Sequence, residues 1–495
     1  YSQKSFMKKN IIVIGSGLAG MASAAYLAKE GHRVKVVEKN STYGGRLQTY
    51  KEKGFTFDLG PSWYWMPDLF ESFFSDFDRR ASDYYTLTRL DPGYRVYFED
   101  KEFFDVPENY KKLKKNLEKI EPGSSDALDE FLSDGKIKYE IAVKKFIYKP
   151  SLSPFEYIRL DLIKHLGRLA IFKPISKHIR EFFTDKRIIQ MLEFPGLLLG
   201  AKPSKTPALY SLMNYADIKL GTWYPSGGIR SVATAVQSVA VEQGVEFVYD
   251  EPIKKIHKKD RSVFEVISKN RSYEADIVIA NADYEHVETN LLDKKYRNYS
   301  KAYWNKRTMS PSALLFYIGI NKKINIPHHC LFFDTNFNSH VKDIYDDPKW
   351  PDNPLFYVSC TSKTDLDVAP SGSEALFVLI PVAPDLTDEP ALRNSYLDQV
   401  LDRIEQKTGE SIRSNVVLTR SYAHKEFISD FNSFKGNAYG LANTLFQTAF
   451  LKPKIKNSRL SNLYYTGQLT VPGPGMPPAL VSGKIVAKQV MKDNS

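Results

Sequence analysis

The N-terminal part of the chain alternates short apolar runs with a longer helix-forming stretch. Ile11 to Ile14 predicts a buried strand, Met21 to Lys29 predicts a helix, and Val34 to Val37 predicts a second strand. Strand, helix and strand in this order are typical of a parallel βαβ unit. Phe55 to Asp58 alternates apolar and polar residues, which predicts a half-buried strand.

The same mixture of strands and helices returns in two later parts of the chain. Ser231 to Gln243 predicts a helix, and three strands are predicted at Val245 to Val248, Ile253 to Ile256 and Asp276 to Ala280. Ser461 to Asn494 predicts a strand, a loop rich in Pro and Gly, and a final helix. The pattern therefore predicts the α/β fold class.

The segments between these parts have a different pattern. From Asp105 to Arg187 the sequence becomes basic and helix-like, and several strand-like runs lie between Ser312 and Pro381, among them the apolar run Leu314 to Ile320. At 495 residues the chain exceeds what one hydrophobic core usually serves. We expect one α/β domain assembled from residues 7–95, 222–295 and 455–495, and a second, α+β domain made of residues 96–221 and 296–454.

Charge and cysteine content narrow the possible functions. The net charge of +11 suggests an acidic partner surface, either anionic lipid or nucleic acid. The only two cysteines, Cys330 and Cys360, exclude a disulfide framework and a cysteine-ligated zinc or iron–sulfur cluster, and no metal site is predicted. Tyr1 to Phe6 precede Met7 and are set aside as a terminal remnant. Because no signal pattern follows and no run of about 18 apolar residues occurs, we expect a cytoplasmic protein without a spanning helix.

A glycine motif follows the first predicted strand. Gly15, Gly17 and Gly20 have the dinucleotide-binding spacing: the first allows a tight turn, the second lets backbone approach a pyrophosphate, and the third allows close helix–strand packing. Glu38, at the end of the second strand, can accept hydrogen bonds from an adenosine ribose and would repel the 2′-phosphate of NADP. The contacts predicted here are Gly15, Gly17, Leu18, Ala19, Gly20, Glu38 and Lys39.

The next segments favour FAD over NAD. The glycine pair Gly44-Gly45 brings backbone close to the cofactor, and the guanidinium of Arg46 can pair with a pyrophosphate oxygen. Asp58 to Ser62 places a glycine at a strand end, where a flavin ring could be approached. The contacts predicted here are Gly45, Arg46, Gly60, Pro61 and Ser62.

The C-terminal segment carries a further motif. Tyr464 to Gly467 predicts a strand that enters a turn, and Pro472 to Pro478 introduces a helix in which Pro477 suits the first turn. A helix start at this point would aim free N–H groups at the pyrimidine edge of a flavin. The remaining predicted contacts are Ile253, Gly467, Gln468, Gly475, Met476 and Pro477.

These segments together resemble one family, the bacterial-type phytoene dehydrogenases or carotenoid desaturases within the amine-oxidase-like flavoproteins. The resemblance covers nearly the whole chain, including Trp223 to Gly228 and Ala280 to Asp283, and its most specific part is Asn462 to Met476 with Ser482-Gly483. It implies a Rossmann-type domain that binds FAD non-covalently and an inserted α+β substrate-binding domain. It also implies removal of two hydrogens across a C–C bond of a long, hydrophobic carotenoid.

Two departures from the family pattern point to a branch. Gln468 and Leu469 stand where the family usually has two small residues, and Val471 stands where a polar residue is usual. Gln468 could donate a hydrogen bond to the flavin or to a substrate oxygen. Among related branches the chain looks most like the hydroxy- or methoxy-carotenoid 3,4-desaturases, and a phytoene desaturase is the alternative.

The catalytic step and the electron acceptor follow from the same resemblance. A hydrocarbon offers no group for acid–base catalysis, so we predict no catalytic side chain. His424 and Asp58 lie near family motifs, and we interpret both as structural. Because no second GxGxxG motif follows a strand, we expect oxygen or a membrane quinone to accept the electrons.

One segment suggests contact with a membrane. Residues 136–187 hold thirteen Lys and Arg against five Asp and Glu, with aromatic residues between them. Such a surface suits an anionic bilayer, so we expect peripheral association with the inner face of the cytoplasmic membrane. A solvated helical face is the alternative, and no zinc spacing or RNA-binding motif supports nucleic-acid binding.

Two other classes resemble this fold. Amine or porphyrinogen oxidases act on polar or nitrogenous substrates, whereas the Rab escort proteins and GDP-dissociation inhibitors have lost the flavin and are not enzymes. Because this sequence has both Arg46 and the C-terminal Gly/Pro motif, it argues against the flavin-free Rab escort proteins and GDP-dissociation inhibitors.

Overall fold

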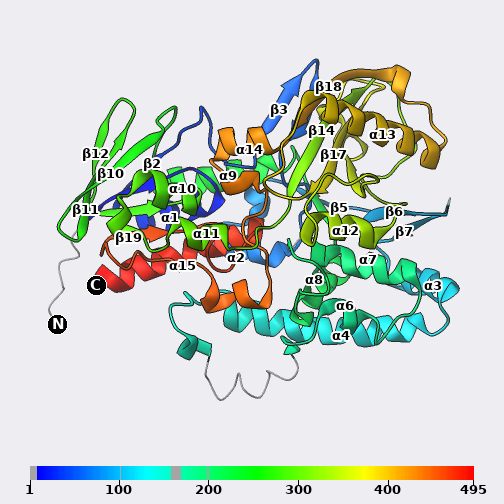
Figure 1. The fold of residues 1–495 in the computed structure, drawn as a ribbon, viewed down its shortest axis with the longest axis horizontal. Helices are drawn as coiled ribbons and strands as arrows, with labels where there is room; N and C mark the ends of the chain where they lie inside the picture. Colours follow the sequence, from blue (N-terminus) through cyan, green and yellow to red (C-terminus); the bar gives the residue numbers. More distant parts are fainter. Residues whose placement is uncertain (1–7, 101, 158–168, 198–199, 495) are drawn as a thin grey trace.

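The computed structural model describes residues 8–100, 102–157, 169–197 and 200–494. Tyr1 to Phe6, and residues 158–168 of the predicted membrane segment, lie outside the described residues. A five-stranded parallel sheet lies on the left of Figure 1. Its strands, in order, are β19 (Leu463–Tyr465), β13 (Ile277–Ala280), β1 (Asn10–Ile14), β2 (Arg33–Val37) and β9 (Glu246–Val248).

The central strands β1 and β13 are buried on both faces, and both are nearly continuous apolar runs, as is typical of parallel sheets. Ile11 and Val13 point to one side and belong to the core formed with helices α1 (Leu18–Lys29), α9 (Arg230–Glu242) and α15 (Met476–Asn494). Ile12 and Ile14 point to the other side. There they pack with the antiparallel sheet of β10 (Ile253–Lys259), β11 (Ser262–Ser268) and β12 (Ser272–Glu274). The predicted α/β fold is confirmed.

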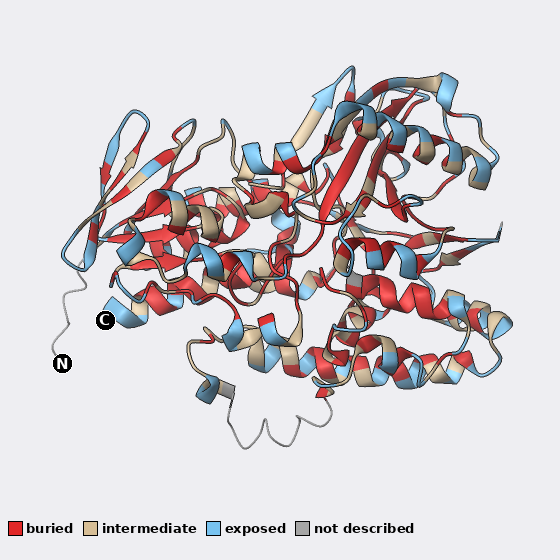
Figure 2. Ribbon diagram, in the orientation of Figure 1, coloured by how far each residue is buried: buried red, intermediate tan, exposed pale blue. Residues whose placement is uncertain are grey.

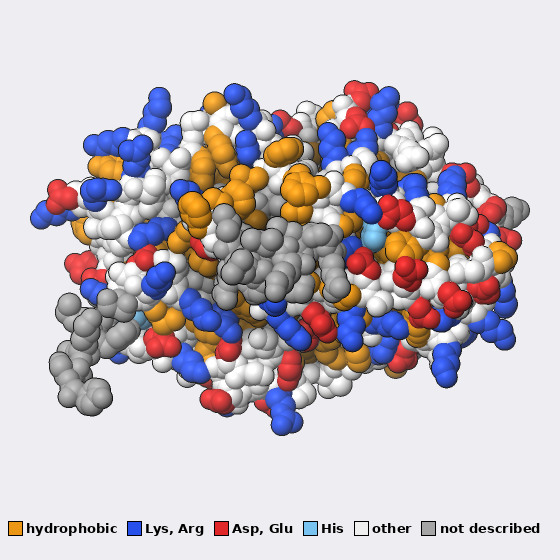
Figure 3. Space-filling view, turned by 90° about the horizontal axis from the view of Figure 1, so that it is seen from below, with side chains coloured by type: hydrophobic (Ala, Val, Ile, Leu, Met, Phe, Trp, Pro, Cys, Tyr) orange, Lys and Arg blue, Asp and Glu red, His pale blue; other side chains and the backbone are white. Residues whose placement is uncertain are grey.

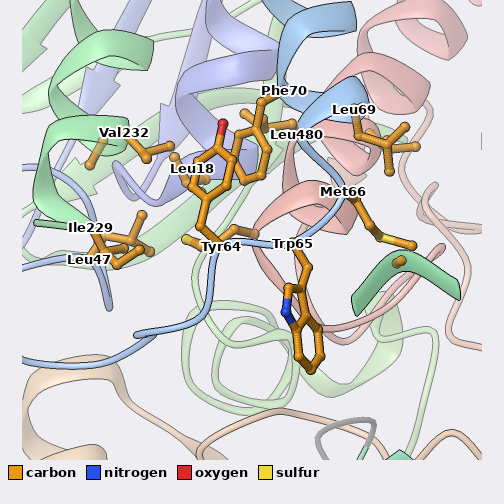
Figure 4. Packing of buried hydrophobic residues seen from close by; sticks show 14 of the residues in the cluster. Leu18, Leu47, Tyr64, Trp65, Met66, Leu69, Phe70, Ile229, Val232 and Leu480 are labelled. Carbon is orange, nitrogen blue, oxygen red and sulfur yellow. The ribbon is translucent and has the colours of Figure 1, made fainter. Parts of the chain in front are cut away.

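Segments far apart in the sequence meet beside the first helix. Figure 4 shows Leu18, Tyr64, Phe70, Ile229 and Leu480 packed together, although they come from four separate parts of the chain. The rings of Tyr64 and Phe70 stack with their centroids 4.3 Å apart. This packing ties α1, α9 and α15 to helix α2 (Pro67–Ser75) and fixes the loops at the carboxyl ends of the strands.

A seven-stranded mixed sheet forms the upper right of Figure 1. All neighbouring strands are antiparallel except β15 and β6, which are parallel. The predicted strand Leu314 to Ile320 is confirmed as part of β14, the second strand from one edge of this sheet, and every residue of that strand is buried. In order, the strands are β18 (Val416–Tyr422), β14 (Ser312–Ile320), β17 (Glu374–Val382), β16 (Phe356–Cys360), β15 (His329–Phe333), β6 (Tyr94–Phe98) and β7 (Phe103–Val106).

The two faces of this sheet have different neighbours. Leu314, Phe316 and Ile318 pack in a core with helix α13 (Pro390–Thr408), whereas Leu315 and the alternate residues of the neighbouring strands face the interior of the molecule. Figure 2 shows the buried residues concentrated in both sheets, with the outer side of α13 exposed. Cys330 and Cys360 are both buried free thiols of this sheet, as expected for structural cysteines.

A layer of helices lies below the seven-stranded sheet (Figure 1). It consists of α3 (Tyr110–Ile120), α4 (Ser124–Ile141), α6 (Ile175–Ile179), α7 (Lys186–Leu197) and α8 (Leu212–Tyr215). In the part of the chain that the structure describes, no helix is both long and apolar enough to cross a bilayer. The remaining elements outside the short helical turns are β3 (Thr49–Glu52), β4 (Phe55–Asp58), β5 (Leu87–Arg89), β8 (Trp223–Pro225), α10 (Tyr284–His286), α11 (Lys301–Asn305), α12 (Phe337–Tyr345) and α14 (His424–Phe431).

The division into domains follows the two sheets. All five strands of the parallel sheet lie within residues 7–95, 222–295 and 455–495. The expected boundary at residue 95 runs through β6, which pairs with β7 and β15 of the other sheet. We therefore propose that the second domain begins before Tyr94.

Candidate functional site

One large cavity connects the parallel sheet with the seven-stranded sheet and the helical layer. It has a volume of about 1320 Å³, and apolar side chains make up most of its wall. All but one of the predicted cofactor-binding residues line it. These are Gly15, Gly17, Leu18, Ala19, Glu38, Lys39, Gly45, Arg46, Gly60, Pro61, Ser62, Ile253, Gly467, Gln468, Gly475, Met476 and Pro477.

The exception, Gly20, lies behind the glycine loop. A Cβ at this position would stand 2.4 Å from the carbonyl oxygen of Gly15 and 2.7 Å from Nδ2 of Asn281. Gly20 is thus a packing residue, as its place in the motif predicts. At Gly17 a Cβ would stand 2.9 Å from the same Asn281 nitrogen, so the asparagine holds the loop against the strand.

The start of α1 is open to the cavity. Helix α1 follows Gly17, an N-cap residue that has no side chain to accept a hydrogen bond from the first N–H groups. Gly15 has φ of +97°, which a residue with a side chain rarely adopts. Free N–H groups at a helix start favour an anion such as a pyrophosphate.

Glu38 lies at the carboxyl end of β2 and is buried in the wall of the cavity. Its Oε2 accepts hydrogen bonds from the backbone amide of Ser16 at 2.7 Å and from the Ser16 hydroxyl at 2.8 Å. Its Oε1 accepts a hydrogen bond from the backbone amide of Asn40 at 2.9 Å. These bonds fix the carboxylate beside the glycine loop, where a ribose of a bound dinucleotide is expected.

Arg46 is a half-buried cation that joins two parts of the chain. Its Nη2 donates to the hydroxyl of Ser433 at 2.6 Å, and its guanidinium lies 4.9 Å from the ring centroid of Phe431. Within the described residues its Nε has no hydrogen-bond partner. Burial lowers the pKa of Arg46, while the charge of Asp283 opposes this shift. A guanidinium with a spare donor fits an anionic or oxygen-rich group of a cofactor.

The C-terminal motif closes the same side of the cavity. The backbone amide of Gly467 donates to Oγ of Ser482 at 3.0 Å, which ties the end of β19 to helix α15. Gly467 also faces Asn281, because a Cβ on the glycine would stand 3.2 Å from Oδ1 of the asparagine. The glycine loop, Asn281 and the C-terminal motif therefore form one wall, and the residues present fit an extended dinucleotide.

Neither Asp58 nor His424 lines this cavity among the described residues. Asp58 accepts hydrogen bonds from the backbone amides of Ile229 at 2.8 Å and Arg230 at 3.2 Å, at the start of α9. Burial raises its pKa to about 6. Nε2 of His424 lies 2.8 Å from the carbonyl oxygen of Ala383, and burial lowers the pKa of this histidine. Both contacts support the structural interpretation of these two residues.

The far part of the cavity is an apolar chamber that the sequence did not reveal. Alternate residues of four strands form one side, together with Leu355 just before β16, and residues of the helical layer form the other. The strand residues are Ala313, Leu315, Leu331, Phe333, Tyr357, Leu379 and Pro381, and the facing residues include Phe194, Leu209, Leu212 and Met213. Period-two alternation in the strands was the available signal, but it does not tell which face encloses a cavity.

Large hydrophobic side chains are exposed where the cavity approaches the surface. Phe172 and Phe446 line the cavity and are 82% and 77% exposed. Phe450 and Leu451 of the segment 445–451 also line it and are exposed. Figure 3 shows hydrophobic side chains gathered near the middle of the face seen from below, with Lys and Arg around them. We call Phe172, Phe446, Phe450 and Leu451 the cavity rim.

Only part of the predicted membrane segment, residues 136–187, lies at the surface of the molecule. Lys138 is fully buried and contacts Asp134, and Tyr139 and Phe183 are buried as well. In contrast, Phe155 and Phe172 are exposed. The described aromatic residues of residues 136–187 are thus divided between the core and the surface, and three of the four rim residues come from the segment 445–451 instead.

Comparisons with known proteins agree with this geometry. Residues 18–491 match the family of flavin-containing amine oxidoreductases. A carotenoid 3,4-desaturase of Haloarcula japonica is 37% identical over 488 residues, which cover 98% of each chain. A zeta-carotene-forming phytoene desaturase of Myxococcus xanthus is 30% identical over 492 residues, with 98% of this chain and 94% of that protein covered.

Solved structures share the fold at lower identity. An oxidoreductase from Methanosarcina mazei superimposes with a TM-score of 0.63 at 18% identity, covering 98% of this chain and all of that one. Putrescine oxidase bound to putrescine gives a TM-score of 0.63 at 12% identity, with 98% and 99% of the two chains covered. These likenesses concern the fold alone. The chain therefore belongs to the flavin-containing amine oxidoreductases, in the branch of the carotenoid desaturases, and is an FAD-dependent oxidoreductase.

Proposed function

We propose that this enzyme introduces a C=C bond into a long polyene during carotenoid biosynthesis. The observation that carries the proposal is the continuity of the cavity, which joins the wall that fits a dinucleotide to an apolar chamber. Its volume of about 1320 Å³ exceeds the roughly 300–1,000 Å³ of an ordinary ligand pocket. Such a volume suits a cofactor together with an extended hydrocarbon.

The chain's own residues act in this proposal by binding and positioning. The glycine loop, Glu38 and Arg46 would hold FAD, which when bound accepts the hydrogen and electrons that leave the polyene. Leu315, Phe333 and the other strand residues of the chamber exclude water and hold the polyene in a fixed orientation. Because a hydrocarbon has no acidic group, positioning can supply most of the catalysis without a proton-transfer residue.

The finer proposal is 3,4-desaturation of a hydroxy- or methoxy-carotenoid. The 37% identical relative is named for a 3,4-desaturation, which supports this branch. Gln468 lines the cavity beside Gly440, where a Cβ on the glycine would stand 3.1 Å from Cγ of the glutamine. Because this residue lines the cavity, we propose that its amide donates a hydrogen bond to a cofactor or substrate oxygen. Phytoene desaturation is the second candidate, because the relative from Myxococcus xanthus is named for it.

We further propose that the enzyme draws its substrate from the inner face of the cytoplasmic membrane through the cavity rim. Lys144 and Lys145 are exposed beside Phe146, a cavity residue, and supply positive charge near the rim. Oxygen or a membrane quinone is the proposed electron acceptor, because the sequence offers no second dinucleotide motif.

Two alternatives make different demands on the cavity. An amine or porphyrinogen oxidase needs polar groups to bind a nitrogenous substrate, whereas the strand residues of this chamber are almost all apolar. A flavin-free escort protein has no use for a half-buried Arg46 and an intact glycine loop.

The test is incubation of the purified enzyme with carotenoids in liposomes, followed by absorption spectroscopy. The proposal expects a 1-hydroxylated carotenoid to be dehydrogenated once, with a red-shifted spectrum, and phytoene to be left largely unchanged. Several desaturations of phytoene at a comparable rate would assign the enzyme to the phytoene branch. Conversion of amines or porphyrinogens without any carotenoid conversion would overturn the proposed reaction.

A further inference from the structure

Two tyrosines in the cavity wall have hydroxyl groups that lack a partner among the described residues. Tyr345, the last residue of α12, and Tyr439 both line the cavity. Across the described residues, neither phenol oxygen makes a hydrogen bond. Burial raises the pKa of Tyr439 to about 12, so its hydroxyl remains a donor at neutral pH. Burial and, secondarily, the electrostatic influence of Tyr439 raise the pKa of Tyr345 as well.

The backbone on both sides of Tyr439 is fixed. The amide of Ala438 donates to the carbonyl of Pro311 at 3.2 Å, and the amide of Ser310 donates to the carbonyl of Gly440 at 2.8 Å. Gly440 in turn packs against Gln468 of the C-terminal motif. Tyr439 is therefore held between the start of β14 and the wall that fits the cofactor.

Hydrogen bonds between α12 and the seven-stranded sheet fix the position of Tyr345. Nε2 of His340 lies 2.8 Å from the carbonyl oxygen of Pro381, and Nδ1 of His340 accepts a hydrogen bond from the amide of Leu355 at 2.8 Å. These bonds fix the helix to strand β17 and to the segment that leads into β16. The position of Tyr345 at the cavity thus follows from the sheet.

A third tyrosine connects this pair to the cofactor side. Tyr357 lines the cavity, and its hydroxyl lies 2.7 Å from Nδ1 of His329. The ring centroids of Tyr357 and Trp63 lie 5.3 Å apart, and Trp63 follows Ser62, a predicted flavin contact. Tyr439 precedes Gly440, which packs against Gln468, so it too lies on the side of the cavity that fits the flavin.

A purely hydrocarbon ligand would leave these hydroxyls without partners when it displaces water from the chamber. Buried hydroxyls are normally hydrogen-bonded, because burying them alone is costly. An oxygen on the polyene would satisfy them. In a polyene whose end carries a hydroxyl or ether group a few carbons from the bond that reacts, the oxygen of this group also lies close to the flavin.

We propose that Tyr345 and Tyr439 form a subsite that binds an oxygen atom near the end of the polyene and so selects oxygenated substrates. This inference rests on the proposed function and deepens it. Both hydroxyls donate to the substrate oxygen, which can belong to an alcohol or an ether, and the tyrosines act as specificity residues.

The test compares two carotenoids that differ only in one terminal hydroxyl group. Dissociation constants and kcat/KM are measured for both with the FAD-loaded enzyme in liposomes. Tyr439→Phe and Tyr345→Phe should each weaken binding of the hydroxylated carotenoid and lower its kcat/KM by about threefold to tenfold, the scale of one hydrogen bond. The values for the hydrocarbon should remain unchanged or improve.

Tyr210→Phe is the matched control. Tyr210 also lines the cavity, but its hydroxyl lies 3.5 Å from Oγ1 of Thr448. Its removal should alter the values for both carotenoids in the same proportion. Equal changes for both carotenoids in the Tyr345 and Tyr439 variants, or no change, would overturn the subsite.

The outcome also separates this inference from the proposed function. If the wild type converts both carotenoids equally well and the variants do the same, the subsite fails and the desaturase function stands. If the wild type converts neither, the function fails, and the dissociation constants still decide whether the tyrosines recognise oxygen. Melting temperatures of the Phe variants check that they fold.

Discussion

The carboxylate of Glu38 accepts two hydrogen bonds from Ser16, one from its backbone amide at 2.7 Å and one from its hydroxyl at 2.8 Å. Ser16 lies between two glycines of the dinucleotide motif, so this contact fixes the carboxylate to the loop that approaches the pyrophosphate. The order of strand, glycine loop and acidic residue in the sequence thus becomes one rigid arrangement in the fold.

Glu38→Ala should weaken FAD retention by roughly 1.5–3 kcal/mol, because hydrogen bonds from the ribose to a charged group are lost. Equilibrium dialysis of the folded protein measures this loss. Glu38→Gln keeps an amide oxygen for Ser16 and separates the cofactor effect from damage to the loop.

Glu246→Ala serves as the control for this position. Glu246 lies on the neighbouring strand β9, where it is exposed and pairs with Lys35 at 3.1 Å. This variant should retain FAD like the wild type. A folded Glu38→Ala protein that also keeps its full complement of FAD on dilution would contradict the assignment.

Replacement of Phe172 and Phe446 by Ser should weaken flotation with anionic liposomes. Burying a Phe side chain in an apolar environment contributes about 1.5–3 kcal/mol, so the double variant should lose at least about tenfold in partitioning. Binding should also weaken with added salt, because basic residues near an anionic surface contribute about 1 kcal/mol each.

Leu366→Ser is the control for exposed hydrophobic area. Leu366 is 79% exposed and lies outside the cavity rim. Its replacement should leave flotation unchanged. If the rim variant floats as well as the wild type, the membrane contact lies elsewhere on the molecule.

The free energy of unfolding should depend on pH through the buried carboxyl group of Asp217. Its carboxylate accepts hydrogen bonds from Thr222 at 2.9 Å and Tyr94 at 3.0 Å, and burial raises its pKa to about 7. Because the folded pKa lies above the unfolded value of 3.8, this group's stabilising contribution is complete below about pH 4 and is lost as the pH rises through 7.

Asp217→Asn stays neutral and keeps an acceptor for one of the two hydroxyls. Relative to the wild type, it should therefore gain stability between pH 4 and pH 8, by at most about 4 kcal/mol for a shift of this size. Thermal melts at both pH values measure the gain. A difference in Tm that is the same at both values would contradict the linkage to this carboxyl group.

Lys452 should have the opposite dependence on pH. Its ammonium has no hydrogen-bond partner among the described residues, and burial lowers its pKa to about 8. The unfolded chain binds this proton more tightly, so the group destabilises the fold below pH 8 and this penalty fades as the pH rises towards 10.5.

Lys452→Met should therefore raise Tm at pH 7, by the equivalent of up to about 3 kcal/mol, and should have a smaller effect at pH 10. Differential scanning calorimetry at the two pH values provides the comparison. A Met variant that is less stable at pH 7 would reveal a partner for the ammonium.

Local patterns in the sequence predicted one half of the site well. The strands at Ile11, Val34 and Asp276 and the glycine loop depend on neighbouring residues, and the structure has them where they were expected. The parallel sheet then brings Gly15 and Gly467 to the same wall, because both follow the carboxyl ends of strands.

The other half of the site depends on long-range contacts. Asp58 meets Ile229 across 171 positions of sequence, and Tyr439 lines the cavity because its loop is hydrogen-bonded to the residues just before β14. Lys138 belongs to a basic segment, yet it is fully buried because Asp134 pairs with it one helical turn earlier. Composition could not distinguish such a lysine from the exposed Lys144.

We infer that in this enzyme the electrons lost by a polyene are delivered to FAD. Anaerobic mixing of the FAD-loaded protein with a 1-hydroxylated carotenoid in liposomes measures this most directly, because flavin and polyene absorption can be followed in one experiment. We predict that one polyene double bond forms for each FAD that is reduced. Reduction of FAD by an amine, with no spectral change on addition of any carotenoid, would contradict the account.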